Sequence, residues 1–164
     1  MSLSDRRKFL IVLAALPLAG CGFTPMLKGG TAARGLQGAL HFNLIDSRMG
    51  YLLLGDLETR FGPSSSPRYD VVIDLKTQET KIVLTAATGV SRITLDGIAK
   101  ISVTPVGADA PAWTGHVHEQ VGYSRTAETA ASGASQRDAE DRLVRGLAEK
   151  IANELAANAA RFGE

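Results

Sequence analysis

Two stretches of the chain alternate between mostly apolar and mostly polar positions. They cover residues 93–104 and 113–124, and a turn-forming segment at 107–111 separates them. Successive side chains of a β-strand point to opposite faces of a sheet, so this period of two predicts two strands with one buried and one wet face. Their close spacing indicates an antiparallel hairpin.

Two further strands are predicted upstream. Residues 39–45 and 69–76 show the same alternation over shorter lengths, with Val72 as an apolar exception. A polar stretch, 77–81, then leads into the apolar residues 82–84. The pattern leaves open whether 77–84 continues the second strand or forms a separate segment.

Two segments carry apolar residues at helical spacing. The first runs from about 47 to 61 and ends at Gly62-Pro63, a pair that stops helices. The second starts at Ser135, where Asp138 completes an approximate capping box, and extends to about Arg161. The residues just before this second segment, 126–134, are mostly Ala, Thr, Ser and Gly and are expected to form a loop.

The predicted order of elements is β-α-β-β-β-α. Three consecutive strands at hairpin spacing, with one helix before and one after them, predict an α+β fold. We expect a four-stranded, mostly antiparallel sheet with two helices packed on one face. The chain shows no internal repeat, and its 164 residues are typical of one domain.

The N-terminus has the layout of an export signal. The cluster Arg6-Arg7-Lys8 precedes an apolar run at 9–18, which is too short to span a bilayer. Leu18-Ala19-Gly20-Cys21 then resembles the bacterial lipobox, in which the chain is cut before a Cys that becomes lipidated. The alternative is a signal peptide followed by an unmodified Cys. Residues 5–10 also resemble a twin-arginine motif, and both this route and general export remain open.

These observations predict three parts of the chain. Residues 1–20 are a signal peptide cleaved between Gly20 and Cys21, residues 21–38 are the lipidated Cys and a glycine-rich tether, and residues 39–164 are a single α+β domain. A lipid anchor with more than one acyl chain holds a protein stably at a membrane. Gly22, where inner-membrane lipoproteins carry a retention Asp, favours the outer membrane.

Charge and composition exclude several functions. The full chain has 18 basic and 17 acidic side chains, and removing residues 1–20 leaves 15 and 16, or a net charge near −1. Nucleic acid is therefore not an expected partner, because binding its phosphates requires a basic surface. The single Cys can form neither an internal disulfide nor a Cys-rich zinc site.

No catalytic constellation is evident. The chain has no GxSxG elbow and no phosphate-binding glycine loop, so neither an enzyme nor a cofactor is expected. His116 and His118 share a strand face, but His41 is the only other His, and we favour exposed polar positions over a metal site. Asp70 and Asp74 are interpreted in the same way.

A family resemblance rests on the lipobox and the residues after it. Cys21-Gly22-Phe23-Thr24-Pro25, followed by the β-α-β-β-β-α order, resembles the LPS-assembly lipoprotein LptE family. The order of elements covers the mature chain, whereas the sequence motif is short. The resemblance implies an outer-membrane lipoprotein on the periplasmic side that is not an enzyme. It would sit inside the LptD β-barrel, assist its assembly and help deliver lipopolysaccharide to the outer leaflet.

No local motif transfers the family's lipid-binding residues to this chain. Arg92 and Lys100 are the candidates for lipopolysaccharide phosphates, because they flank or lie on the wet face of the strand at 93–104. The same surface could bind only protein. The alternative function is an auxiliary lipoprotein adaptor of an inner-membrane transport system, and a periplasmic hydrolase is a third possibility that lacks a catalytic set.

Overall fold

The computed structural model describes residues 31–43, 46–85, 90–125 and 129–163. Its elements follow one another in the order α2 (Thr31–Arg34), β1 (Leu40–Phe42), α3 (Arg48–Phe61), β2 (Tyr69–Thr85), β3 (Val90–Pro105), β4 (Trp113–Arg125), α4 (Thr129–Asn158) and the 3-10 helix η2 (Ala159–Gly163). The predicted signal peptide, Cys21 and most of the predicted tether lie outside the described residues.

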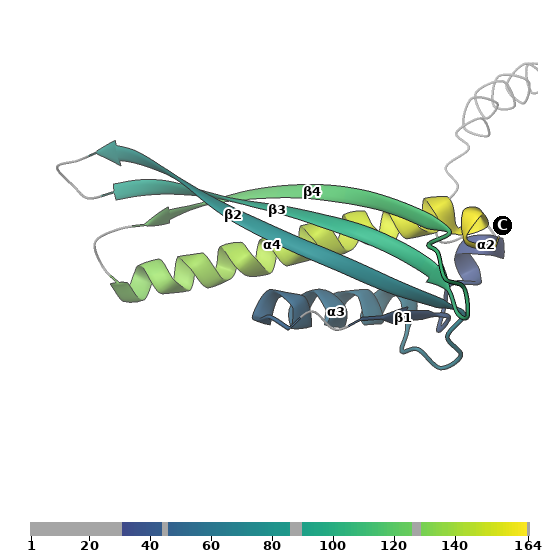
Figure 1. Ribbon diagram of the computed structural model, residues 1–164. Coiled ribbons are helices and arrows are strands. Elements are labelled where there is room, and N and C mark those ends of the chain that lie inside the picture. Colours follow the sequence, from purple (N-terminus) through teal and green to yellow (C-terminus); the bar gives the residue numbers. More distant parts are fainter. Residues whose placement is uncertain (1–30, 44–45, 86–89, 126–128, 164) are drawn as a thin grey trace, which may run out of the picture.

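The sheet confirms the predicted fold class. Its four strands lie in the order β1-β2-β3-β4, with β1 parallel to β2 and the remaining pairs antiparallel. Both α3 and α4 lie on one side of the sheet (Figure 1). α4 packs on β3 and β4 and also contacts α3, so the apolar core lies between one sheet face and the two helices.

β2 and β3 form a hairpin that is longer than the sequence pattern specified. The segment 77–84 continues β2 as part of one strand of 17 residues. Alternate residues of this segment face the helix side yet stay exposed, namely Thr77, Glu79 and Lys81. α4 packs on β3 and β4 there, so polar side chains are tolerated on this part of β2.

α3 forms as predicted. The side chain of Ser47 accepts a hydrogen bond from the Gly50 amide at 3.0 Å and caps the helix. Leu53, Leu57 and Phe61 form its buried stripe. Gly62 ends the helix at φ 76°, a left-handed conformation that glycine adopts without steric cost.

The prediction for the start of the second long helix is wrong. α4 begins at Thr129, so most of the loop expected at 126–134 is helical; residues 126–128 lie outside the described part. Ser135 and Asp138 are therefore inside the helix, where Asp138 pairs with Arg142 at 2.9 Å rather than forming a cap. Buried Ala139 packs with Ile93 and Tyr123, which ties this half of α4 to the sheet.

The packed domain also starts earlier than residue 39. The described part of the expected tether includes α2, and Leu36 is only 2% exposed within the main core. The Gly38 amide donates to the Phe61 carbonyl at 2.8 Å, which holds this segment against the end of α3. At the other end of the chain, Phe162 of η2 is 0% exposed and contacts the rings of Tyr69 and Trp113.

Gly97 is the point of closest approach between β3 and α4. A Cβ atom at this position would lie 3.0 Å from Leu143 Cδ2 and 3.1 Å from Leu147 Cδ1. The absence of a side chain at Gly97 thus allows the two leucines to pack directly on the sheet.

We expect Gly97→Val to lower the free energy of unfolding by about 1–3 kcal/mol, because the added isopropyl group overpacks this contact. Urea unfolding measures the change. Gly55→Ala is the matched control: a Cβ there meets nothing within 4 Å, and alanine in a helix is expected to raise stability by about 0.5–1 kcal/mol. A Gly97→Val protein as stable as the wild type would contradict the close packing.

Candidate functional site on the open face of the sheet

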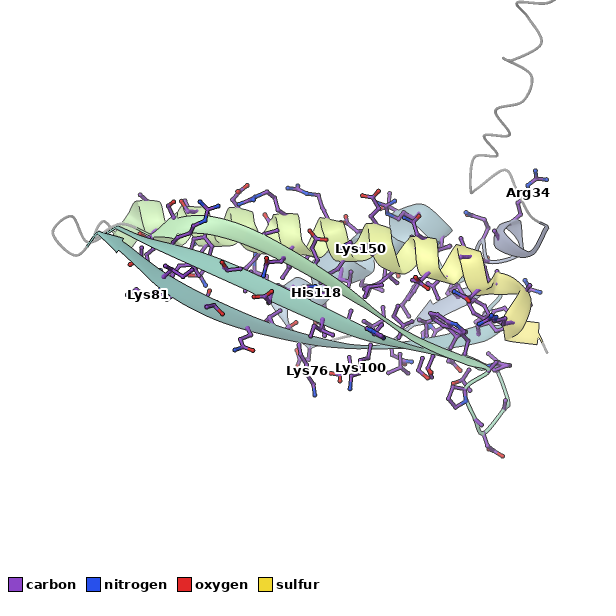
Figure 2. All side chains as sticks on the ribbon, turned by 90° about the horizontal axis from the view of Figure 1, so that it is seen from above. Arg34, Lys76, Lys81, Lys100, His118 and Lys150 are labelled. Atoms are coloured by element: carbon purple, nitrogen blue, oxygen red, sulfur yellow. The ribbon has the colours of Figure 1, made fainter. Side chains whose placement is uncertain are left out.

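The face of the sheet opposite the helices is open to solvent. Every second residue of β2, β3 and β4 points to this side, and the register aligns them in rows across the three strands. Figure 2 shows Lys76 and Lys100 on the side of the sheet away from α4. This face therefore offers a continuous set of side chains, from three strands, for a ligand.

Charged, polar and apolar side chains are mixed on this open face. One row consists of Asp74, Lys100 and His116, and the next consists of Lys76, Ile98 and His118. Ile98 is 44% exposed, and Val72 and Ile82 are also exposed on the same face. A surface of this kind can hold a ligand that has both negative charge and apolar parts.

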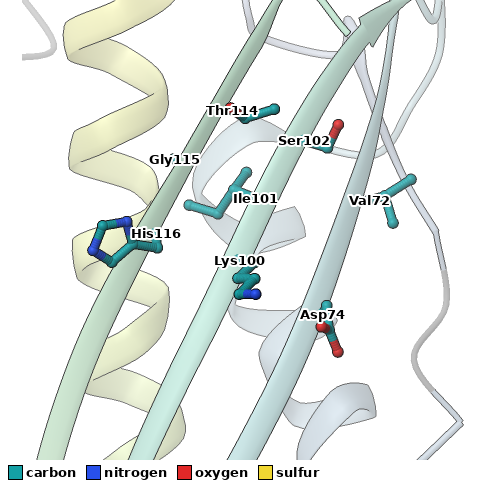
Figure 3. Close-up of a pocket in the computed structure, with 8 residues that line it drawn as sticks. All are labelled: Val72, Asp74, Lys100, Ile101, Ser102, Thr114, Gly115 and His116. Atoms are coloured by element: carbon teal, nitrogen blue, oxygen red, sulfur yellow. The ribbon is translucent and has the colours of Figure 1, made fainter. Parts of the chain in front are cut away.

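A shallow depression of ≈ 380 Å³ lies on the open face, close to the start of β2 and of β4 and to the end of β3. Asp74, Lys100 and His116 come to it from three neighbouring strands, and Val72, Ser102 and Thr114 line its other end (Figure 3). Lys100 lies at the centre of its row, between Asp74 on β2 and His116 on β4. An ammonium group there can bind a phosphate or carboxylate as a point charge.

The structure does not bring the two predicted binding residues together. Arg92 and Lys100 lie on the same face of β3, but the eight residue steps that separate them correspond to about 26 Å along the strand. Arg92 is opposite Ile82 and Ser124, outside the depression. Of these two predicted binding residues, only Lys100 lines the depression.

The histidines do not converge on one point. His116 lines the depression, whereas His118 lies in the next row with its Nε2 3.3 Å from Asp96 Oδ1. Gln120 donates to the same Asp96 oxygen at 2.6 Å. His41 is on β1, two strands beyond β3. Within the described ranges, no group of three or more His, Cys, Asp or Glu side chains could hold a metal ion.

A polar cluster on the helix side was missed by the sequence analysis. The Tyr123 hydroxyl donates to Glu79 Oε1 at 2.9 Å and accepts from Arg125 at 2.9 Å. Burial is the main cause that raises the pKa of Tyr123 above its ordinary 10.0, followed by the hydrogen bond and negative charge of Glu79, and Arg125 opposes the shift. Glu79 lies 44 residues from Tyr123, so no local pattern could reveal the contact.

We expect this cluster to make stability fall at alkaline pH. Above about pH 10 the unfolded tyrosine loses its proton while folded Tyr123 keeps it, so the unfolded state binds fewer protons and gains stability as pH rises. Urea unfolding across this range in wild type and Tyr123→Phe measures the effect. The variant should lose less stability between neutral and alkaline pH, and identical curves would contradict the prediction.

Two side chains of α4 donate hydrogen bonds to backbone carbonyls of β4, the edge strand of the sheet. Lys150 Nζ donates to the His118 carbonyl at 2.6 Å and pairs with Glu119 at 2.7 Å. Arg142 donates to the Gly122 carbonyl at 3.3 Å. Unpaired edge groups invite pairing with another chain, and these two cations satisfy carbonyls of this edge.

Fold and site together define a small α+β domain with one covered and one open sheet face. Solved structures with this fold include a protein assigned as a lipoprotein from Caulobacter crescentus CB15, which is 20% identical with a TM-score of 0.63 and covers 78% of this chain and 96% of its own. A minor lipoprotein from Acinetobacter baumannii is 12% identical with a TM-score of 0.54 and covers 74% and 94%. Rare lipoprotein B from Shewanella oneidensis is 10% identical with a TM-score of 0.48 and covers 77% and 98%.

The first two likenesses show a shared fold. No protein-family model and no curated protein sequence matches the chain. Among the described residues, no helix is long and apolar enough to cross a membrane.

Proposed function

We propose that this protein is a lipoprotein anchored through Cys21 to the periplasmic side of the outer membrane, where it assembles with an LptD-type β-barrel and helps deliver lipopolysaccharide to the outer leaflet. One observation carries the proposal: the sequence from Leu18 to Pro25 precedes a fold that is shared with bacterial lipoproteins. The lipobox supports the anchor, and the Cys-Gly-Phe-Thr-Pro segment supports the family.

The shape of the domain suits a barrel lumen. A strand of 17 residues, β2, extends about 55 Å, which exceeds the apolar band of an outer-membrane barrel, about 25 Å tall. The lumen of such a barrel is polar, and the open sheet face presents mostly polar and charged side chains. An elongated domain of this kind can enter a barrel with mostly polar contacts to its wall, apart from the exposed Val72, Ile82 and Ile98.

The depression around Lys100 suits a phosphorylated glycolipid. Lys100 supplies a cation, Val72 and Ile98 supply exposed apolar area beside it, and Ser102 and Thr114 supply hydroxyl groups. Arg92, about 26 Å away along β3, would contact a separate part of a large ligand. We therefore assign Lys100 the first contact with lipid phosphates.

The test is a pull-down from native membranes through a tag placed after Glu164. Detergent extraction and mass spectrometry should recover a large β-barrel protein in stoichiometric amount. An inner-membrane transporter without a barrel would replace the proposal with the adaptor function. For the lipid, Lys100→Gln should weaken binding of purified lipopolysaccharide, and Lys81→Gln, an exposed lysine outside the depression, is its matched control.

A further inference from the structure

The distal half of β2 has an unpaired edge. β1 pairs with only the first three residues of β2, and Figure 1 shows β1 and α3 beside the first part of β2 only. The Tyr69 amide donates to the Ala39 carbonyl at 3.1 Å, and the Asn43 amide donates to the Val71 carbonyl at 3.0 Å. Backbone groups of successive residues point to opposite sides of a strand. The groups that point to the β1 side further along β2 are therefore those of residues 77, 79, 81 and 83, and no described strand pairs with them.

The opposite edge of the sheet is protected, and this one is open. On β4, Lys150 donates to the His118 carbonyl and Arg142 donates to the Gly122 carbonyl. On β2, the side chains of residues 76–82 are all exposed, on both faces of the strand. A row of unpaired amides and carbonyls is a template for a further strand. We call residues 77–83 the open edge.

The open edge has the length of an ordinary strand. The register between β2 and β3 shifts between Val83 and Thr85, so the regular part of the edge ends there. Its other end, Thr77, lies about 20 Å beyond Val71, the last residue that pairs with β1. Residues 77–83 extend about 23 Å, and strands of globular proteins usually have about 5–6 residues. One further strand therefore fits without displacing β1.

The charges on the open edge fit a second copy of the same strand. Glu79 and Lys81 share the helix side of β2. Glu79 is held by Tyr123 and Arg125 but stays 38% exposed, and Lys81 is exposed with no ion pair to another described residue. If two copies pair antiparallel with Thr80 opposite Thr80, Glu79 of each copy lies opposite Lys81 of the other. Opposite charges directly across two strands stabilise the pairing.

The neighbouring registers are disfavoured by the same charges. A side chain keeps its face of the sheet only when the pairing moves by two residues, so one neighbouring register places Glu79 opposite Glu79 and the other places Lys81 opposite Lys81. Like charges directly opposite destabilise a strand pair. In the favoured register the open face has Gln78 opposite Ile82, without a like-charge contact. The order of charges thus selects one register.

We propose that the open edge of β2 pairs antiparallel with the open edge of a second copy, so that two four-stranded sheets join into one continuous sheet with Thr80 at the two-fold axis. The inference concerns the free protein and does not depend on the proposed barrel or lipid. A domain has to leave the pair before it enters a barrel. Pairing therefore covers the edge against other chains until the domain assembles with its partner.

Cysteine cross-linking tests the register. Thr80→Cys is made in the full chain, which is purified in detergent without any barrel and then oxidised. Glu79 and Lys81 would exchange the backbone hydrogen bonds, so the two Thr80 Cα atoms would form a non-hydrogen-bonded pair about 4.5 Å apart, within the range of a disulfide. Gln78→Cys is the matched control: the two Gln78 residues would be four residue steps, or about 13 Å, apart.

We expect disulfide-linked dimers to form at least about fivefold faster for Thr80→Cys than for Gln78→Cys. Mixing Gln78→Cys with Ile82→Cys should give a mixed dimer, since these positions lie opposite each other, although neither variant cross-links with itself. The wild type, whose single Cys is Cys21, measures any contribution of that residue. Intact mass measurement identifies each product.

A charge at the axis tests the same pairing without a cysteine. Thr80→Lys places two like charges opposite each other and should weaken dimerisation about fivefold, as measured by analytical ultracentrifugation in density-matched detergent. Thr94→Lys, the same change at the residue that pairs with Thr80 on β3, lies away from the open edge and should leave dimerisation unchanged.

Three results overturn the inference. A wild-type chain that stays monomeric excludes the pairing. Equal cross-linking of Thr80→Cys and Gln78→Cys would show that contact between the copies has no fixed register. When Thr80→Cys is oxidised in native membranes, a disulfide to a different protein instead of a second copy would assign the open edge to that protein. None of these results bears on the lipid anchor or the barrel, which the membrane pull-down tests separately.

Discussion

Cys21→Ser should release the protein from the membrane. Serine cannot form the thioether that holds the diacylglyceryl group, and each methylene withdrawn from the bilayer costs about 0.8 kcal/mol of anchoring free energy. We expect the variant to move from the membrane fraction to the soluble periplasmic fraction, with slower signal processing and no electrophoretic shift. Fractionation followed by immunoblotting and intact mass measurement reports all three properties.

Thr24→Ser, a small substitution three residues beyond the cysteine, serves as the control and should keep the membrane location. Barrel binding can survive Cys21→Ser, because the plug contacts proposed for the folded domain are separate from the tether. If the Cys21→Ser protein kept its membrane association, and the wild type carried no lipid mass that the variant lacks, the lipid anchor would be excluded. Cys21 would then be an unmodified residue after a signal peptide.

Phe162→Ala should cost about 3–5 kcal/mol of the free energy of unfolding, the largest effect we expect from a single core residue. Phe162 is fully buried, and its ring centroid lies 5.6 Å from that of Tyr69 and 5.9 Å from that of Trp113. Truncation leaves a cavity between the start of β2, the start of β4 and η2. Because small domains have total stabilities of about 5–15 kcal/mol, this loss is a large fraction.

Chemical denaturation of the two proteins measures the difference. Ala160→Ser, two residues earlier and exposed, is the control and should change stability by less than about 0.5 kcal/mol. A loss below about 1 kcal/mol for Phe162→Ala would mean that the C-terminal turn contributes little to the core and that the three-ring contact is not maintained in solution.

Local periodicity was sufficient for most of the fold. The strands at 93–104 and 113–124 and the helix at 47–61 were predicted because burial on one side imposes a period that each segment carries by itself. The first turns of α4 lack an apolar stripe and contain Ser132 and Gly133, so composition alone predicted a loop. Further along the same helix, Ala139 packs against Ile93 and Tyr123, a tertiary contact that no short window contains.

The candidate site was predictable only in part. The alternation along β3 places Lys100 on the wet face, and this placement is correct. Its neighbours Asp74 and His116 depend on the register of two hairpins, which turn geometry and pairing determine together. The separation of Arg92 from Lys100 follows from the rise per residue along a strand, which the sequence alone provides.

The position of Phe162 makes completion of the core depend on a contact between distant parts of the chain. Most strand contacts join neighbours along the chain, so the meander of β2, β3 and β4 can form early. The contact between Phe162 and Tyr69 instead joins residues 93 positions apart, near the two ends of the domain. A chain that lacks Phe162 cannot make this contact, so the three strands of the meander can pair while the core between them and the helices stays incomplete.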